Sequence, residues 1–132
     1  MTAQDTVVRY FDAFNAGDVD AMLDCLTDDV AHHVNEGGVR RGKEAFRAFC
    51  AHMARCYREE LTDLVILTGE DDTRAATEFT VNGTYLATDE GLPEARGQGY
   101  RLPGASLMTL REGRIARITT YYNLADWLKQ VG

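Results

Sequence analysis

The sequence is poor in cysteine and in positive charge. Three cysteines occur among 132 residues and none forms a Cys-x-x-Cys pair, so neither a disulfide framework nor a zinc knuckle is predicted. Lys and Arg number 14 against 21 Asp and Glu, and the resulting formal net charge of −7 disfavours nucleic acid and anionic membranes as partners. We therefore expect a reduced, cytoplasmic protein.

Long apolar runs and linkers are also missing. No stretch of about 18 consecutive apolar residues occurs that would span a bilayer. The first residues, Met-Thr-Ala-Gln-Asp, lack the basic and apolar regions of a secretory signal peptide. With only two prolines, no repeat and no Pro/Ser-rich segment, the chain has no evident domain boundary. Residues 1–132 are therefore predicted to form a single domain.

The first half of the chain has apolar residues at helical spacing. They predict an amphipathic helix over residues 3–16, ended by Gly17 in a left-handed conformation. Asp18 is then expected to cap a second helix, whose apolar stripe reaches Leu26. A third helix is predicted over residues 43–57. The chain therefore begins with a helical hairpin.

Strand signals dominate the rest. A short strand is predicted at Val30 to Val34, and after the third helix the apolar period changes from near 3.6 to 2. Asn123 is expected to cap a short C-terminal helix. Residues 87–97 form the longest connection, an extended hairpin loop that could overhang a site. Helices packed on one face of a curved antiparallel sheet give an α+β fold. The four further predicted strands are residues 61–68, 74–85, 98–111 and 114–122.

Four short motifs follow one another along the chain: Asn15-Ala16-Gly17-Asp18, Leu26-Thr27-Asp28-Asp29-Val30, Arg41-Gly42-Lys43-Glu44-Ala45-Phe46 and Gly113-Arg114-Ile115. These motifs and the order of the segments resemble the nuclear transport factor 2-like superfamily over nearly the whole chain. Within it, the sequence is most similar to ketosteroid isomerase-related and SnoaL-like proteins. The resemblance implies a cone-shaped barrel in which a curved mixed or antiparallel sheet wraps around the N-terminal helices and encloses one deep, largely apolar pocket. It also implies a homodimer that forms through the outer face of the sheet.

Ketosteroid isomerases use a Tyr and a protonated Asp as hydrogen-bond donors, and a second Asp as the base that moves the proton. By this resemblance Tyr10 matches the Tyr, and Ser106 stands where the protonated Asp is expected. The base falls at Val34, or at Asn35 if the turn is shifted by one residue. A Trp that lines the isomerase pocket falls at Tyr122. The usual carboxylate base is therefore missing from its expected place.

A histidine is the leading substitute for that base. His32 shares the strand alternation of Val34, so it, rather than His33, is predicted to point inward. A neutral imidazole with a pKa of about 6.5 is a competent general base. The alternative is that His32 is a structural histidine and Tyr10 a core tyrosine. His52 is expected to serve packing or to lie at the surface.

Strand alternation assigns further residues to the pocket. It turns Phe79 inward and Glu78 outward, whereas the reverse alternation would make Glu78 the leading general base. Tyr100 and Ser106 share the inward direction of the next strand unless Pro103-Gly104 introduces a bulge. The predicted ligand-binding residues are Val34, Asn35, Phe79, Tyr100, Ser106 and Tyr122.

Two functions remain open at this point. In the first, the protein is an enzyme that acts on a small, mostly apolar carbonyl compound such as a steroid- or polyketide-like ring, with Tyr10 polarising the oxygen and His32 moving a proton. In the second, the same pocket binds an apolar ligand without turnover. No metal or cofactor is predicted, since no spaced histidine pair and no phosphate-binding glycine motif occurs. Residues 53–60 alternate in charge and are read as the solvated end of the third helix.

Overall fold

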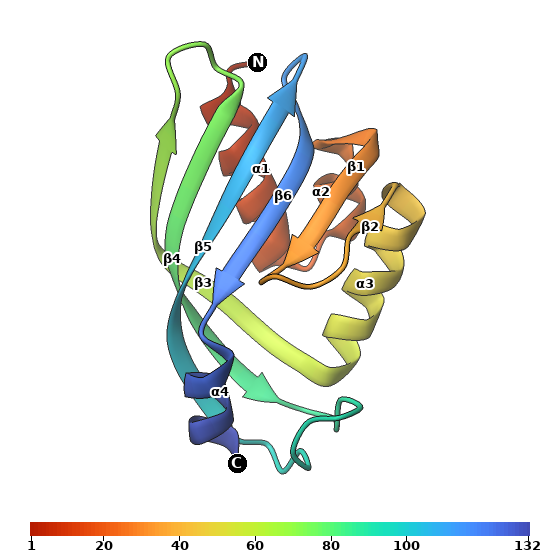
Figure 1. Cartoon of the computed structure of the whole chain (residues 1–132), viewed down its shortest axis with the longest axis vertical. Coiled ribbons are helices and arrows are strands. Elements are labelled where there is room, and N and C mark those ends of the chain that lie inside the picture. Colours follow the sequence, from red (N-terminus) through yellow and green to blue (C-terminus); the bar gives the residue numbers. More distant parts are fainter.

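Residues 1–132 are all described by the structure, which is a computed structural model. Its centre is a six-stranded sheet in the order β2-β1-β6-β5-β4-β3, curved around helices that lie on one of its faces (Figure 1). β1 runs parallel to β6, and every other neighbouring pair is antiparallel, so the sheet is mixed. The elements are α1 (Ala3–Ala16), α2 (Val19–Asp24), β1 (Leu26–Val34), β2 (Arg40–Arg41), α3 (Lys43–Cys56), β3 (Tyr57–Thr68), β4 (Arg74–Tyr85), β5 (Gly99–Arg111), β6 (Arg114–Tyr122) and α4 (Leu124–Val131).

The predicted helical hairpin is confirmed, and its ends have identifiable causes. Thr2 and Asp5 form a capping box at the start of α1, and Gly17 ends the helix with φ of +71°. The Asp18 side chain accepts a hydrogen bond from the backbone N–H of Ala21 and so caps α2. The local sequence alone therefore fixes where α1 ends and α2 begins.

The α+β architecture is confirmed, but the sheet does not close into a complete barrel. β2 and β3 are its free edges. The Asn15 side chain covers part of the β3 edge, since it both donates to the Leu61 carbonyl and accepts from the Leu61 N–H, each at 2.9 Å. At the other end, Gln130 of α4 makes the same pair of hydrogen bonds with Arg101 of β5, beyond the point where β6 stops. Two amide side chains therefore make the backbone hydrogen bonds that a neighbouring strand would otherwise make at these positions.

Three predicted boundaries were wrong. The first strand begins at Leu26 rather than at Val30, and the second helix ends before it, at Asp24. The third helix ends at Cys56, and β3 begins directly at Tyr57 rather than at Leu61. The physical reason is pairing, because residues 57–60 form the ladder with the last residues of β4. Pairing with β4 therefore gives residues 57–60 a strand conformation, although their charge pattern favours a helix.

The predicted alternation along β4 and β5 is confirmed. Phe79 is buried and Glu78 is exposed, so Glu78 lies on the outer face. The register between the two strands continues without a shift past Pro103. The one irregularity in the β3–β4 ladder lies next to Asp63, which has φ of +56°. The inner faces of both strands therefore present their predicted side chains to the helices.

The core fills the space between the helices and the concave side of the sheet. Phe11 of α1 packs on Phe79 with ring centroids 5.8 Å apart. Trp127 of α4, the helix at the lower end of Figure 1, meets Tyr57 and Tyr85 edge-on. None of the helices has the length and hydropathy needed to cross a bilayer.

Candidate functional site

A hydrogen bond between Tyr100 and Glu59 joins two strands that are not neighbours. Glu59 on β3 and Tyr100 on β5 both pair with Gly83 of the intervening β4. Because Gly83 has no side chain, the Tyr100 ring crosses above it, and a Cβ at Gly83 would lie 2.2 Å from Tyr100 Cζ. The Tyr100 hydroxyl then donates a 2.5 Å hydrogen bond to Glu59 Oε2. The absence of a side chain at Gly83 therefore lets the Tyr100 hydroxyl reach the Glu59 carboxyl.

The Glu59 carboxyl has no cationic partner. Burial raises its pKa above the ordinary value, although the hydrogen bond from Tyr100 acts in the opposite direction. Burial also raises the pKa of Tyr100, and the neighbouring Glu59 charge adds to the effect. The same two causes, burial first, raise the pKa of Tyr122. A carboxyl with a raised pKa beside protonated phenols is an arrangement suited to moving a proton.

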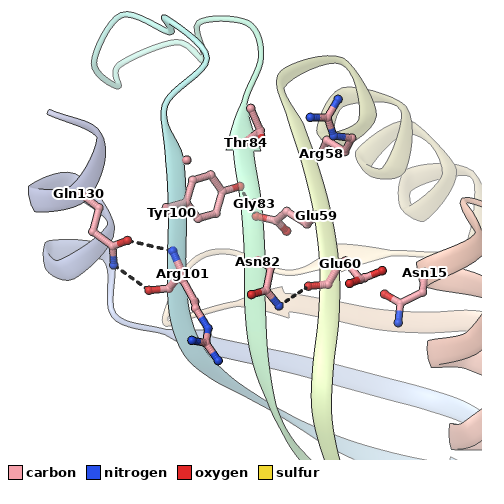
Figure 2. A pocket seen from close by; sticks show the side chains of 11 residues that line it. Asn15, Arg58, Glu59, Glu60, Asn82, Gly83, Thr84, Tyr100, Arg101 and Gln130 are labelled. Carbon is pink, nitrogen blue, oxygen red and sulfur yellow. Dashed lines mark hydrogen bonds between the residues drawn. The ribbon is translucent and has the colours of Figure 1, made fainter.

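Glu59 and Tyr100 line an open cavity of about 780 Å³. Figure 2 shows that its lining side chains come from the end of α1, from β3, β4 and β5, and from α4. Most of them are polar, and they include Asn82, Arg101 and Gln130. A ligand of this cavity would therefore carry several polar groups, unlike the largely apolar ligand implied by the resemblance.

Two of the predicted ligand-binding residues lie at a second cavity. Phe79 and Tyr122 line a volume of about 570 Å³, together with Glu78 and Tyr121 of the outer face. Phe79 covers Gly104 of β5, where an added Cβ would lie 2.6 Å from the Phe79 ring. The Phe79 and Gly104 pair mirrors the Tyr100 and Gly83 pair on the same two strands.

The predicted catalytic residues, Tyr10 and His32, are buried in the core, away from the two cavities. Both rings contact Phe46, with centroid distances of 6.4 Å for Tyr10 and 5.1 Å for His32. Burial, with the neighbouring Arg40 charge, lowers the pKa of His32 to about 4, and its Nδ1 has no hydrogen-bond partner. Burial raises the pKa of Tyr10. His32 is therefore neutral at pH 7 and a weaker base than a free imidazole. Neither residue lines the two cavities described above.

The remaining predicted residues form a row across the sheet. Val34 pairs with Thr120 of β6, and Thr120 pairs with Ser106 of β5. The hydroxyls of Ser106 and Thr120 are hydrogen-bonded at 3.0 Å. Asn35 uses its side-chain oxygen to accept from the Tyr122 N–H at 2.9 Å, which ties the turn after β1 to the end of β6. Asn35 therefore has a structural role in addition to the ligand-binding role predicted from the sequence.

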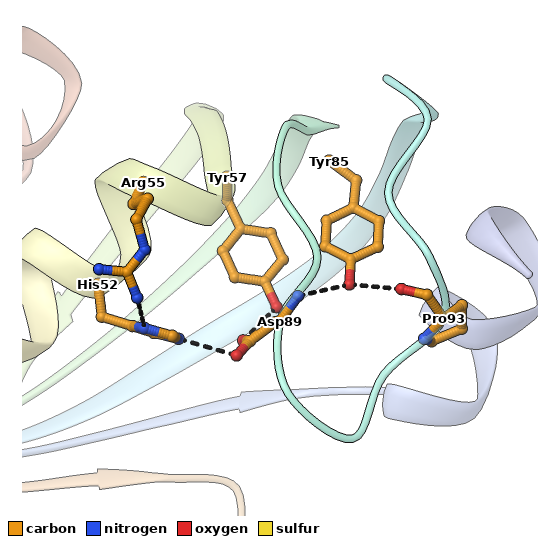
Figure 3. Close-up of polar contacts among 6 residues, drawn as sticks. All are labelled: His52, Arg55, Tyr57, Tyr85, Asp89 and Pro93. Atoms are coloured by element: carbon orange, nitrogen blue, oxygen red, sulfur yellow. Dashed lines mark hydrogen bonds and ion pairs between the residues drawn. The ribbon is translucent and has the colours of Figure 1, made fainter.

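A second polar network holds the loop between β4 and β5 against α3 (Figure 3). Asp89 of this loop accepts hydrogen bonds from the Tyr57 hydroxyl at 2.6 Å and from His52 at 2.9 Å. Burial alone would raise the pKa of Asp89, but these two hydrogen bonds outweigh it and lower the pKa. The Tyr85 hydroxyl accepts from the Asp89 N–H and donates to the Pro93 carbonyl. The loop that the sequence predicted to overhang a site is therefore anchored at several points.

The sequence interpretation missed Glu59 because it assigned residues 53–60 to the solvated end of a helix. A signal was present, since Tyr57, Glu59 and Leu61 alternate with charged residues at the strand period. That alternation competes with the helical spacing of the residues before it. Only the pairing with β4 decides between them.

Comparison with known proteins now identifies the family. The model of the SnoaL-like domain matches residues 7–118. The chain belongs to the SnoaL-like family. No functionally curated protein matches it.

Solved structures of other proteins are similar to this chain over nearly its whole length. A candidate polyketide cyclase from Silicibacter sp. TM1040 is 69% identical, covering 99% of this chain and 96% of that one with a TM-score of 0.97. Another, from Pseudomonas putida KT2440, is 52% identical, covering 100% and 99% of the two chains with a TM-score of 0.98. A protein with a ketosteroid isomerase-like fold from Catenulispora acidiphila is 19% identical, covers 96% of this chain and 92% of that one, and has a TM-score of 0.78, which supports the fold alone. The expected superfamily is therefore confirmed.

Proposed function

We propose that this SnoaL-like protein is an enzyme that moves a proton on a small carbonyl compound, with Glu59 as the proton-carrying group. The observation that carries the proposal is the half-buried Glu59 carboxyl, hydrogen-bonded by Tyr100 on one oxygen only. Its second oxygen, Oε1, makes no hydrogen bond within the chain and is free to accept a proton. Glu59 would then supply the carboxylate that is missing from its expected place at Val34.

The reaction follows from this geometry. The Glu59 carboxylate takes the proton from the carbon next to a carbonyl, and negative charge develops on the carbonyl oxygen. A neutral phenol stabilises that charge by donating a hydrogen bond. We assign this donor role to Tyr100, which lines the same cavity as Glu59 and whose hydroxyl is released from the carboxylate once Glu59 has taken the proton. Returning the proton to another carbon gives an isomerase. If the enolate carbon instead attacks a second carbonyl, the π bond of that carbonyl breaks, its oxygen takes the proton back from Glu59, and the enzyme is a cyclase.

The character of the cavity favours one substrate class. Its lining is mostly polar, although Asn82 and Arg101 are the strand neighbours of Gly83 and Tyr100 and so point to the face of the sheet opposite Glu59. A polyketide-like compound, which carries several oxygens, suits a mostly polar cavity better than a steroid does. The relatives named as candidate polyketide cyclases point in the same direction. We therefore propose a polyketide-like carbonyl compound as the substrate.

The test is exchange of the proton next to a carbonyl. Small β-diketones incubated with the protein in D₂O are followed by NMR, which reads proton abstraction without knowledge of the natural substrate. Glu59→Gln is expected to slow exchange by about 10²–10⁴-fold. The rate in the unchanged protein should rise with pH through the raised pKa of Glu59, because only the ionised form is a base.

His32→Gln is the matched comparison, since His32 is the base predicted from the sequence. Exchange that survives Glu59→Gln and is lost in His32→Gln would reject Glu59 and support the pair Tyr10 and His32. A protein that binds a planar phenol but exchanges no proton would support the second function, a non-catalytic binder of a small ligand.

We further propose that the chain forms a homodimer through the outer face of the sheet. Leu67, Ala76 and Leu107 stand side by side on neighbouring strands of this face, and Tyr121 follows in the next row. Leu67 is 64% exposed, Leu107 43% and Tyr121 41%. The helices cover the opposite face (Figure 1), so a second copy is the occupant that we assign to this apolar surface.

A further inference from the structure

The last turn of α3 brings a histidine and a cysteine to one face. His52 and Cys56 are four residues apart on the helix, the spacing that places two side chains one above the other. Asp89, from the loop between β4 and β5, reaches the same place and hydrogen-bonds to His52. The imidazole nitrogen, the thiol sulfur and the carboxylate oxygen all lie within 4.8 Å of one another. Three metal-ligating groups from two distant segments therefore converge on one point.

We propose that His52, Cys56 and Asp89 bind one zinc ion. Imidazole nitrogen, thiolate sulfur and carboxylate oxygen are the three donor types that proteins use for zinc. Zinc–ligand bonds of about 2.0–2.3 Å in a tetrahedral site place ligand atoms roughly 3.3–3.8 Å apart. The His52 Nε2 to Asp89 Oδ1 distance of 2.9 Å would therefore open by about 0.4 Å, and the distances to the Cys56 sulfur, which are at most 4.8 Å, would close by roughly 1.3 Å or less. Three protein ligands leave the fourth position to water or to an external ligand.

The surroundings of Asp89 match those of a metal-binding carboxylate. The Tyr57 hydroxyl occupies one oxygen, Oδ2, at 2.6 Å, and leaves Oδ1 to face His52. The Asp89 backbone is fixed through its N–H, which donates to the Tyr85 hydroxyl. Hydrogen bonds of this kind orient the ligands of metal sites.

An ion can reach this place from solvent. The side chain of His52 is 38% exposed and that of Asp89 is 20% exposed, whereas Cys56 is buried. The Cys56 thiol is therefore the ligand shielded from solvent, and His52 and Asp89 are the ligands that solvent reaches. Entry of the ion requires no rearrangement of the strands.

Arg55 opposes metal binding in the present arrangement. Its guanidinium lies 3.0 Å from His52 Nδ1, and because a guanidinium only donates, Nδ1 must be the acceptor. The imidazole hydrogen is then on Nε2, which donates to Asp89. Zinc at Nε2 requires this hydrogen to move to Nδ1, and the exposed Arg55 must turn away. Arg55 therefore favours the His52 tautomer with its hydrogen on Nε2, which cannot bind zinc through that nitrogen.

The test is direct binding of zinc to the complete chain. Equilibrium dialysis against ZnCl₂ should give one zinc per chain, and Co²⁺ in its place should produce a thiolate-to-metal absorption band. Cys56→Ser and Asp89→Asn should abolish this binding, and Tyr57→Phe should weaken it by about 10–100-fold. Arg55→Gln should strengthen it, because a Gln side-chain oxygen accepts from the hydrogen on Nδ1.

Cys50→Ser and His33→Asn are the controls, since these residues offer the same ligand types elsewhere. They should retain one zinc per chain. Binding that is equal in Cys56→Ser and the unchanged protein, or that is lost in Cys50→Ser, would overturn the proposal. If Cys56→Ser fails to fold, the cobalt spectrum of the unchanged chain decides, because a spectrum without a thiolate band excludes Cys56 as a ligand.

Discussion

Tyr100 reaches Glu59 across a strand that lies between them. The hydroxyl-to-carboxylate distance is 2.5 Å, although the two residues belong to β5 and β3 and are separated by β4. The crossing depends on Gly83, which leaves room for the aromatic ring. Phe79 lies in the same way over Gly104, so each of the two long strands supplies a ring that covers a glycine of the other.

The first prediction concerns the space above Gly83. In Gly83→Ala the new Cβ would displace the Tyr100 ring and break its hydrogen bond with Glu59. The backbone of Gly83 is not left-handed, so the effect comes from crowding alone. We expect a loss of about 1–3 kcal/mol in the free energy of unfolding, measured by urea denaturation. The rate of proton exchange catalysed by Glu59 should also fall in this variant.

Gly99→Ala is the matched control for this prediction. Gly99 lies on β5 next to Tyr100, and an added Cβ would meet only the Gly83 carbonyl oxygen at 3.9 Å, an ordinary contact. The free energy of unfolding should change by no more than about 0.5 kcal/mol. Equal losses in the two variants would mean that a side chain anywhere in this region is harmful and that the crossing of Tyr100 is not the cause.

Much of the fold was predictable from local signals. Gly17 and Asp18 mark the turn between the first two helices, and their roles depend only on backbone conformation and side-chain chemistry. The strict alternation over residues 74–85 predicted both ends of β4 and the outward direction of Glu78. Such features are decided within a few residues, so the sequence alone is sufficient.

The candidate site was less predictable because it depends on distant contacts. Glu59 turns inward because residues 57–60 pair with β4, and its partner Tyr100 is 41 residues away. The resemblance directed attention to Tyr10 and His32, which lie near Phe46 and away from the two cavities. Strand alternation predicts neither the space above Gly83 nor the separation of the Glu59 site from Tyr10 and His32.

The second prediction concerns the pH dependence of stability at His32. Burial lowers the pKa of His32 to about 4 in the folded state, against about 6.5 in the unfolded chain. Between these values the unfolded state binds more protons, so stability falls as the pH decreases from 6.5 toward 4. The loss is about 3 kcal/mol at most, and urea denaturation at pH 7 and pH 4 measures it.

His32→Phe isolates this contribution. A phenyl ring retains the packing against Phe46 and Phe49 but does not titrate. The difference in stability between this variant and the unchanged protein should therefore grow as the pH decreases. A constant difference between pH 7 and pH 4 would show that His32 titrates normally in the folded state.

The third prediction concerns the anchor of the loop after β4. Asp89→Asn removes the charge that accepts hydrogen bonds from Tyr57 and His52. Loss of hydrogen bonds to a charged group should cost about 1–3 kcal/mol of unfolding free energy and should free the loop for proteolysis. Limited digestion and urea denaturation measure the two effects. Glu90→Gln, at the exposed neighbour, should change neither of them, and faster cleavage in both variants would contradict an anchoring role for Asp89.

The fourth prediction tests the proposed dimer at the outer face of the sheet. Leu107→Glu places a charge in the row that Leu107 forms with Ala76 and Leu67. Desolvating an unpaired carboxylate at an interface is costly, so we expect the variant to sediment as a single chain and the unchanged protein at twice that mass. Val8→Glu provides the control, because Val8 is also exposed but lies on α1. Its sedimentation should match that of the unchanged protein. If the Leu107→Glu chain remains at twice the single-chain mass, the copies must associate through a different surface.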